Sequence, residues 1–287
     1  MAYDLTVSLV GSNGDTIVFD NDVYTILSGL KGFGIPATNL KIIDSALDGG
    51  VFRHTKRGVR EIDLPVMIYG PDRATTEGYA RRLANALGNS NGAATLKVAN
   101  AVDGNTYSIG VYYAGGAETV FGETAGLTFC QWAIVLQAPD PFWYSNASQS
   151  FVVTSGQTGR GLLPRLSNLK LTNSQAIGTI NITNTAGDVP SYPVWQLTGP
   201  MDSCTITQNG VGFTYNAPIA AGDVVTINTK TSTVTNLAGS NVYSNLNAAP
   251  KFFTIPSGTS TIYVYGANTT SASNITCTYL PRREVVH

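Results

Sequence analysis

The sequence has little charge and little histidine. Only 12% of its 287 residues are Asp, Glu, Lys or Arg, about half of the ~25% usual for soluble proteins. The 17 basic and 18 acidic side chains nearly cancel, which excludes a broadly basic nucleic-acid binder, because such binding depends on neutralising phosphates. Hydrophobic residues make up 43%, so the chain can bury a core and is not a disordered polyelectrolyte.

Cysteines and long apolar runs are also scarce. Cys130, Cys204 and Cys277 are far apart and odd in number, which excludes a disulfide framework and a Cys-x-x-Cys metal site. We expect all three to be buried as small apolar side chains. No apolar run approaches the ~20 residues that span a bilayer, and the first residues lack the basic and apolar regions of a signal peptide. The sequence therefore predicts neither a membrane span nor secretion.

Catalytic motifs are missing as well. The two histidines are His54 and His287, and no Gly-x-Ser-x-Gly, His-Glu-x-x-His, Walker A or Rossmann pattern accompanies them. Asp20 and Asp22 form a weak pair of carboxylates. A glycosidase needs only two carboxylates, so that class stays open on this pattern alone, although the second half of the chain has few acids. We predict no enzymatic activity, no metal and no cofactor.

Alternating apolar residues indicate strands in the first half. Ile62–Ile68, Tyr107–Tyr113 and Cys130–Leu136 each have period 2, as half-buried strands do. Pro65 cannot donate to a ladder, so we expect an edge or a bulge there. One segment differs, because an apolar stripe in it has helical spacing. We predict a helix over residues 74–87, with Asp72 among the candidate caps.

The two halves of the chain differ in charge and pattern. Residues 1–145 hold 10 basic and 14 acidic side chains, whereas residues 146–287 hold 7 and 4. Pro139 and Pro141 end the first part as a stiff linker. The second part has short strand-like runs between turn residues, which suggests a β-sandwich. These runs are Thr179–Thr183, Val224–Ile227, Phe252–Ile255, Thr261–Tyr265 and Ile275–Leu280, and Asn209-Gly210 predicts a two-residue hairpin turn.

Arg53, His54, Lys56, Arg57 and Arg60 form the densest charged cluster. The simpler interpretation is a solvated hairpin loop. The sharper interpretation is an arm that docks on the acidic surface of a neighbouring subunit. Under the second interpretation, the four fixed cations (Arg53, Lys56, Arg57 and Arg60) are the candidate residues of an oligomer interface.

Exposed aromatic residues could alternatively form a platform on which a sugar stacks. The candidates are Trp195, Tyr243 and Tyr263. Trp195 lies between apolar neighbours, Val194 and Leu197, which favours a core position for it.

Several segments, taken in order, resemble a known family. They are Gly32–Pro36, Arg60–Gly70, Gln137–Tyr144, Gly187–Val194, Ala221–Thr229, Phe253–Gly258 and Tyr279–Arg283. This order is similar to that of the distal tail proteins of siphophages, often labelled minor tail proteins, over nearly the whole chain. Asn228 stands where the family more often has Asp, and Thr259 where it often has Asn.

The resemblance implies a mainly β fold with two domains. Residues 1–145 would form a tail-tube-like β-sandwich with one helix, which builds a ring, usually of six copies, around a channel for DNA. Residues 146–287 would form a galectin-like β-sandwich that faces outward. The implied role is structural and non-catalytic, and the implied location is the virion tail tip, after synthesis in the host cytoplasm.

The resemblance also implies the partners of such a ring. These are the tail tube protein, the tail hub or spike protein, the tape measure protein and in some members receptor-binding proteins, while DNA passes without specific binding. A carbohydrate-binding β-sandwich displayed on the particle stays open as the alternative function.

Overall fold

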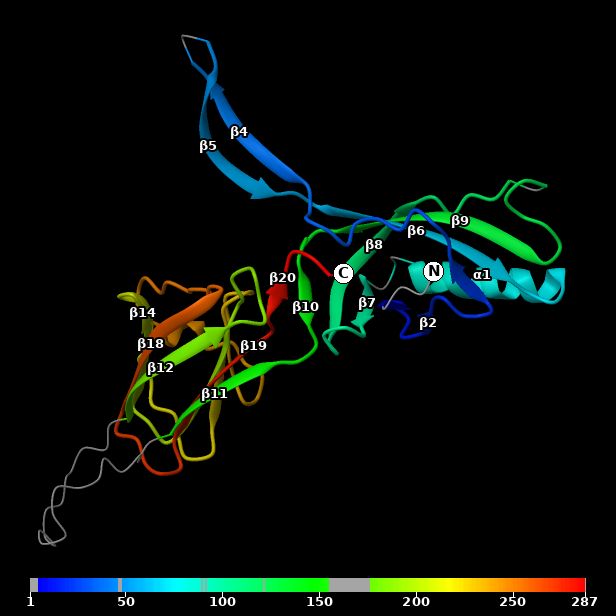
Figure 1. Ribbon diagram of the computed structural model, residues 1–287. Helices are drawn as coiled ribbons and strands as arrows, with labels where there is room; N and C mark the ends of the chain where they lie inside the picture. Colours follow the sequence, from blue (N-terminus) through cyan, green and yellow to red (C-terminus); the bar gives the residue numbers. More distant parts are fainter. Residues whose placement is uncertain are drawn as a thin grey trace, which may run out of the picture. The chain divides into compact units, whose positions relative to one another are not determined.

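The computed structural model describes residues 5–45, 48–88, 90, 92–120, 122–154 and 176–286 (Figure 1). The chain divides into two compact units. Unit 1 contains residues 1–147 together with 283–287, and unit 2 contains residues 148–282. The last residues are therefore grouped with the N-terminal unit, and nothing in the sequence pattern signals this return.

Unit 1 is built on a nine-stranded sheet with the order β2-β1-β7-β8-β9-β6-β3, to which β10 and β20 are added. Strand β8 pairs with β7 up to Val111 and with β9 from Tyr112 onward. The long strand thus passes from one half of the sheet to the other, which lets the two halves enclose a core. The strands are β1 (Leu5–Val10), β2 (Thr16–Val18), β3 (Tyr24–Ile26), β6 (Arg60–Tyr69), β7 (Ala94–Asn100), β8 (Thr106–Gly115), β9 (Phe129–Ala138), β10 (Trp143–Ser145) and β20 (Arg282–Arg283).

Strand β6 shows how the alternating pattern becomes structure. Ile62, Leu64, Val66 and Ile68 are fully buried, while the alternate residues Asp63, Pro65 and Met67 are partly exposed. Pro65 lies just beyond the pairing of β6 with β3, which ends at Ile26. Only the pairing with β3 stops here, because Pro65 still lies opposite Ala133 of β9 in an unbroken register. Strand β6 is therefore an inner strand, and the edge or bulge expected at Pro65 is not found.

The predicted helix is confirmed as α1 (Arg73–Leu87). The side chain of Asp72 accepts a hydrogen bond of 2.8 Å from the backbone N–H of Thr75, which satisfies one of the unpaired donors of the first turn. This bond also lowers the pKa of Asp72. Leu83, Ala86 and Leu87 are buried against the sheet.

A separate hairpin belongs to unit 1. It consists of β4 (Thr38–Asp44) and β5 (Gly50–Arg57), which pair only with each other. Figure 1 shows the hairpin as a projecting arm. The sequence-based interpretation of the basic cluster as a loop is wrong, because its residues lie on strands. Arg53, His54, Lys56 and Arg57 belong to β5, and Arg60 begins β6.

Unit 2 is a two-sheet β-sandwich. One sheet has the order β11-β19-β13-β16-β17 and the other β12-β18-β14-β15. Trp195 and Leu197 are fully buried in its core. The elements are β11 (Gln149–Thr154), β12 (Ala176–Asn184), β13 (Val194–Thr198), β14 (Ser203–Gln208), β15 (Val211–Tyr215), β16 (Val224–Asn228), β17 (Thr233–Asn236), η2 (Tyr243–Asn245), β18 (Gly258–Ala267) and β19 (Asn274–Tyr279).

In unit 2, the predicted hairpin turn is present, but one of the predicted strands is not. Asn209 and Gly210 have φ values of 51° and 76° and join β14 to β15, as the two-residue turn requires. The strand predicted over Phe252–Ile255 is wrong, because only Ile255 forms an isolated bridge, to Ser191. Phe252 and Phe253 instead pack on Phe213, at centroid distances of 5.5 and 6.3 Å.

The mainly β fold class is confirmed, with α1 as the single α-helix among the described residues. The three cysteines are free and buried, as expected. Burial raises the pKa of the Cys204 and Cys277 thiols to about 12, so at neutral pH neither is a thiolate nucleophile.

Candidate functional site

The β4–β5 hairpin exposes large apolar side chains. Ile42 of β4 lies opposite Phe52 of β5, and Leu40 lies two residues before Ile42, so all three side chains share one face. The exposed fraction is 55% for Ile42, 58% for Phe52 and 62% for Leu40. We call Leu40, Ile42 and Phe52 the apolar face of the hairpin. An apolar patch of this kind on a projecting element is typical of a surface that another molecule covers.

The opposite face of the hairpin carries basic side chains toward its base and the exposed apolar pair of Ile43 and Val51 nearer its tip. Lys41 pairs with His54, whereas the next residue, Ile42, pairs with Phe52. Arg53 is therefore the extra residue of a β-bulge in β5. Lys56 lies opposite Asn39, on the same face as Lys41 and His54. We call Lys41, His54 and Lys56 the basic face, and all three are exposed.

Arg57 ties the base of the hairpin together. Its guanidinium donates to the hydroxyl of Thr38, the first residue of β4. The same guanidinium donates from Nε to Oε1 of Glu284 over 2.7 Å, and its NH2 nitrogen also lies 2.7 Å from that oxygen. Both side chains of this ion pair are largely shielded from water, with exposed fractions of 32% and 20%. Arg57 is thus a structural link between the two strands and the end of the chain.

Arg60 is buried, with only 1% of its surface exposed. It donates four hydrogen bonds of 2.5–2.6 Å to backbone carbonyls and also lies over the ring of Trp143, 5.8 Å from the centroid. Burial lowers the pKa of Arg60 to about 10, and the charge of Glu284 opposes this shift. Its acceptors are the carbonyl oxygens of Gly32, Gly34, Pro141 and Glu284.

The end of the chain is held by further contacts within unit 1. Arg283 donates to Oδ2 of Asp103 over 3.0 Å and lies 4.8 Å from the centroid of the Tyr107 ring. Burial, together with a hydrogen bond from the Tyr107 hydroxyl to Asp103, raises the pKa of Tyr107 to about 12. The backbone N–H of Val286 donates to the carbonyl of Phe33 over 3.0 Å, and the Val286 side chain is buried. We call residues 283–286 the tail.

The four candidate interface residues therefore separate into two pairs. Arg53 and Lys56 are exposed on the hairpin, where they can meet another molecule. Arg57 and Arg60 hold its base from inside, so an interface role is now proposed for Arg53 and Lys56 only. Sequence reasoning missed the apolar face, although the alternation of Leu40, Lys41 and Ile42 was a signal for a strand.

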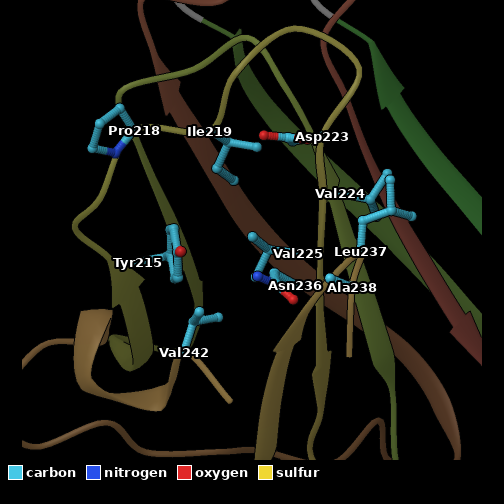
Figure 2. Close-up of a pocket in the computed structure, with 10 residues that line it drawn as sticks. All are labelled: Tyr215, Pro218, Ile219, Asp223, Val224, Val225, Asn236, Leu237, Ala238 and Val242. Carbon is cyan, nitrogen blue, oxygen red and sulfur yellow. The ribbon is translucent and has the colours of Figure 1, made fainter. Parts of the chain in front are cut away.

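A second surface feature lies in unit 2. A pocket of about 420 Å³ opens beside β15, β16 and β17. Figure 2 shows its apolar walls, which include Ile219 and Leu237, with Asp223 and Asn236 as polar groups. The carboxylate and the amide lie apart in Figure 2, and they do not form a nucleophile next to a base.

Of the three aromatic candidates for a sugar platform, only Trp195 is excluded by burial, since Tyr243 and Tyr263 are both exposed. Trp195 is fully buried, which confirms the core position expected for it. Tyr243 packs edge-on against Phe252 at a centroid distance of 6.3 Å. Tyr263 is exposed on β18.

The described part of the chain holds neither a cluster of metal ligands nor a membrane-spanning helix. In this part of the chain, no group of three His, Cys, Asp or Glu side chains is placed to hold a metal ion. No helix in it is long and apolar enough to cross a membrane.

The sequence of unit 2 matches a known family. Residues 186–282 match the family described as the siphovirus-type tail component, C-terminal domain. A search of curated proteins finds no match. The resemblance to siphophage distal tail proteins is confirmed by this match and by the solved structures.

Solved structures of phage proteins share the fold over nearly the whole chain. The crystal structure of SPP1 Dit (gp 19.1), described as a paradigm of the hub adsorption apparatus in phages that infect Gram-positive bacteria, has a TM-score of 0.69 at 12% identity. The match covers 97% of this chain and 98% of that one.

The baseplate of phage P2 in its activated conformation gives two further matches. The structure with Ca has a TM-score of 0.57 at 11% identity and covers 100% of both chains. The structure with Sr has a TM-score of 0.54 at 11% identity and covers 96% of this chain and 97% of that one. At such low identities, these likenesses show the fold alone.

Proposed function

We propose that this protein is a structural component of a siphophage tail tip, where copies of it form a ring that joins the tail tube to the hub or baseplate. The observation that carries this proposal is the apolar face of the hairpin, which no described part of unit 1 covers. The family match of residues 186–282 and the fold shared with SPP1 Dit support it. The role is structural and needs no catalytic step.

A ring would follow from one kind of contact between copies. We propose that the hairpin of one copy contacts a different surface of the next copy, which makes the contact heterologous. Repeated heterologous contacts close into a ring when the rotation per copy divides a full turn, and a closed ring leaves no arm uncovered. We propose six copies, the number that the resemblance implies.

The proposed ring also implies positions for the other partners. The tail tube protein would lie on one side, the hub or spike protein on the other and the tape measure protein inside, with DNA passing through the channel without specific binding. We further propose that unit 1 builds the ring and that unit 2 faces outward as a separate domain, where receptor-binding proteins could attach. The proposed location is the virion tail tip, after synthesis in the host cytoplasm.

The proposal is tested by the size of the full chain in solution. Mass photometry over a range of concentrations should show a species of about six times the 30.3 kDa chain. If the ring needs a neighbour as a template, the species should form once the tail tube protein or hub protein of the same phage is added. A chain that stays monomeric at every concentration and with both proteins present contradicts the proposal.

The exposed cations of the hairpin should tune this assembly through charge. Arg53→Gln with Lys56→Gln removes two positive charges while Arg57 and Arg60 keep the base intact. We expect assembly at low salt to weaken by about three- to tenfold and to depend less on salt, because screened charge pairs are what is lost. Mass photometry at two ionic strengths measures both effects.

A matched variant controls for the change in net charge. Lys230→Gln with Lys251→Gln removes the same charge from exposed positions of unit 2, and it should assemble like the parent. Equal behaviour of the two double variants would rule out a charge contribution from the hairpin.

A further inference from the structure

We propose that the tail is a latch that fixes the direction of the β4–β5 hairpin and so presets it for the neighbouring copy. The latch residue is Glu284, a positioning residue that acts through Arg57. The inference rests on the proposed function in one respect, namely that the hairpin is the arm through which copies meet. The latch itself is a property of the single chain and can be measured there.

The hairpin has few contacts that could set its direction. Every residue of its two strands is exposed except Arg57, which is half-buried, and the strands pair only with each other. The direction of the hairpin is therefore set by contacts at its base. There, the N–H of Gly58 donates to the carbonyl of Ala37 over 2.7 Å, and Arg57 lies opposite Thr38. These contacts join the two strands to each other, but they do not join the hairpin to the rest of unit 1.

Glu284 supplies the link to the rest of unit 1. Its carboxylate accepts from Arg57 while Arg57 also donates to Thr38, so Glu284 is joined to β5 directly and to β4 through Arg57. The carboxylate is 20% exposed. An ion pair shielded in this way is worth more than a fully solvated one, because water competes less for the two charges.

The tail can act as an anchor because it is itself held on both sides of Glu284. Arg283 is bound to Asp103 at the turn between β7 and β8. The carbonyl of Glu284 accepts a bond of 2.6 Å from the buried Arg60, and Val286 is bound to Phe33. The backbone on either side of the carboxylate is thus fixed to three separate parts of unit 1, and motion of Arg57 relative to unit 1 must break its ion pair.

A fixed arm matters for a ring because closure demands one rotation per copy. An arm that pivots about its base samples many directions, and binding then costs the entropy of choosing one. Holding the arm in the bound direction beforehand removes that cost, which is the general advantage of preorganisation. The latch therefore predicts tighter assembly without any contact between Glu284 and the neighbouring copy.

The test is hydrogen exchange, measured by mass spectrometry on the full chain below its assembly concentration. The variants are Glu284→Gln, Arg57→Gln and the combination of both. In each single variant, amides at the base of the hairpin, Gly58 among them, should exchange about five- to tenfold faster than in the parent. The combined variant should exchange no faster than the singles, because the two residues act through one contact.

Control regions and a control variant separate a latch from general loosening. Peptides from β6, β9 and α1 should keep the protection of the parent. Arg81→Gln breaks the exposed ion pair between Arg81 and Glu77 and should leave the hairpin base unchanged. The latch is overturned if Glu284→Gln leaves exchange at the base unchanged, or if exchange rises equally throughout unit 1.

Assembly gives the second measurement. Glu284→Gln should raise the concentration at which half of the chains are assembled by about fivefold or more. If the base loosens but assembly is unchanged, the presetting role is overturned. If the base loosens and the parent itself stays monomeric with tube and hub proteins present, the ring proposal fails and the latch stands.

Discussion

The variant with Leu40→Thr, Ile42→Thr and Phe52→Thr is expected to remain monomeric at concentrations where the parent forms the proposed ring. Burial of an apolar side chain of this size contributes about 1.5–3 kcal/mol. Threonine keeps part of that area, so the three changes together should cost on the order of 4 kcal/mol per contact, a roughly thousandfold weaker affinity. Threonine is also a good strand former, so the hairpin should persist.

Mass photometry of the parent and the triple variant at equal concentrations measures this effect, with circular dichroism to verify the fold. The matched control is Val152→Thr, Val211→Thr and Leu237→Thr, which replaces three exposed apolar residues of unit 2. The control should assemble normally. A triple hairpin variant that assembles as well as the parent would show that the apolar face is not the contact surface.

Arg60→Met is expected to lower the free energy of unfolding of unit 1 by about 3–5 kcal/mol. Methionine fills similar space but leaves four carbonyls without their donor, one in a buried and three in part-buried hydrogen bonds. Since domains are typically stable by about 5–15 kcal/mol, such a loss is a large part of the total. Arg60→Lys should recover little, because one ammonium cannot reach carbonyls on three different segments as a planar guanidinium does.

Thermal and urea unfolding of the full chain would measure this change, with the Trp143 environment reporting on unit 1. The transition of unit 2 should keep its midpoint, since Arg60 makes its contacts within unit 1. Arg81→Met is the control, because Arg81 is exposed on α1, and its midpoint should move by no more than a few degrees. An Arg60→Met protein as stable as the parent would refute the structural role assigned to Arg60.

The sequence predicts the strands and the helix well because their cause is local. Ile62–Ile68 alternate since one face of β6 is buried, and Leu83 and Leu87 share a stripe since one face of α1 packs on the sheet. The strand predicted over Phe252–Ile255 is not formed, because the apolar character of this segment has another cause. Its two phenylalanines are apolar because they pack on Phe213, and burial of that kind requires no ladder.

The candidate site was harder to predict because burial of a charge depends on distant residues. Arg53, Lys56, Arg57 and Arg60 look alike in sequence, yet Arg60 is enclosed by carbonyls brought together from Gly32, Pro141 and Glu284. The apolar face was hidden for a related reason. Apolar and polar residues alternate in the same way whether a strand is buried by the protein's own core or by another molecule. The sequence pattern alone therefore cannot show that Leu64 is in the core and Leu40 is exposed.

The return of residues 283–286 to unit 1 makes that unit discontinuous in sequence, with the whole of unit 2 inserted before its last segment. A ribosome builds the chain from the N-terminus, so the hairpin emerges long before Glu284 is synthesised. Arg60 meanwhile lacks one of its acceptors, and Arg57 lacks its anion. If Glu284 is the proposed latch, nascent chains carry arms whose direction is not yet fixed, and the fixed arm exists only in chains whose translation has passed the last segment of unit 1.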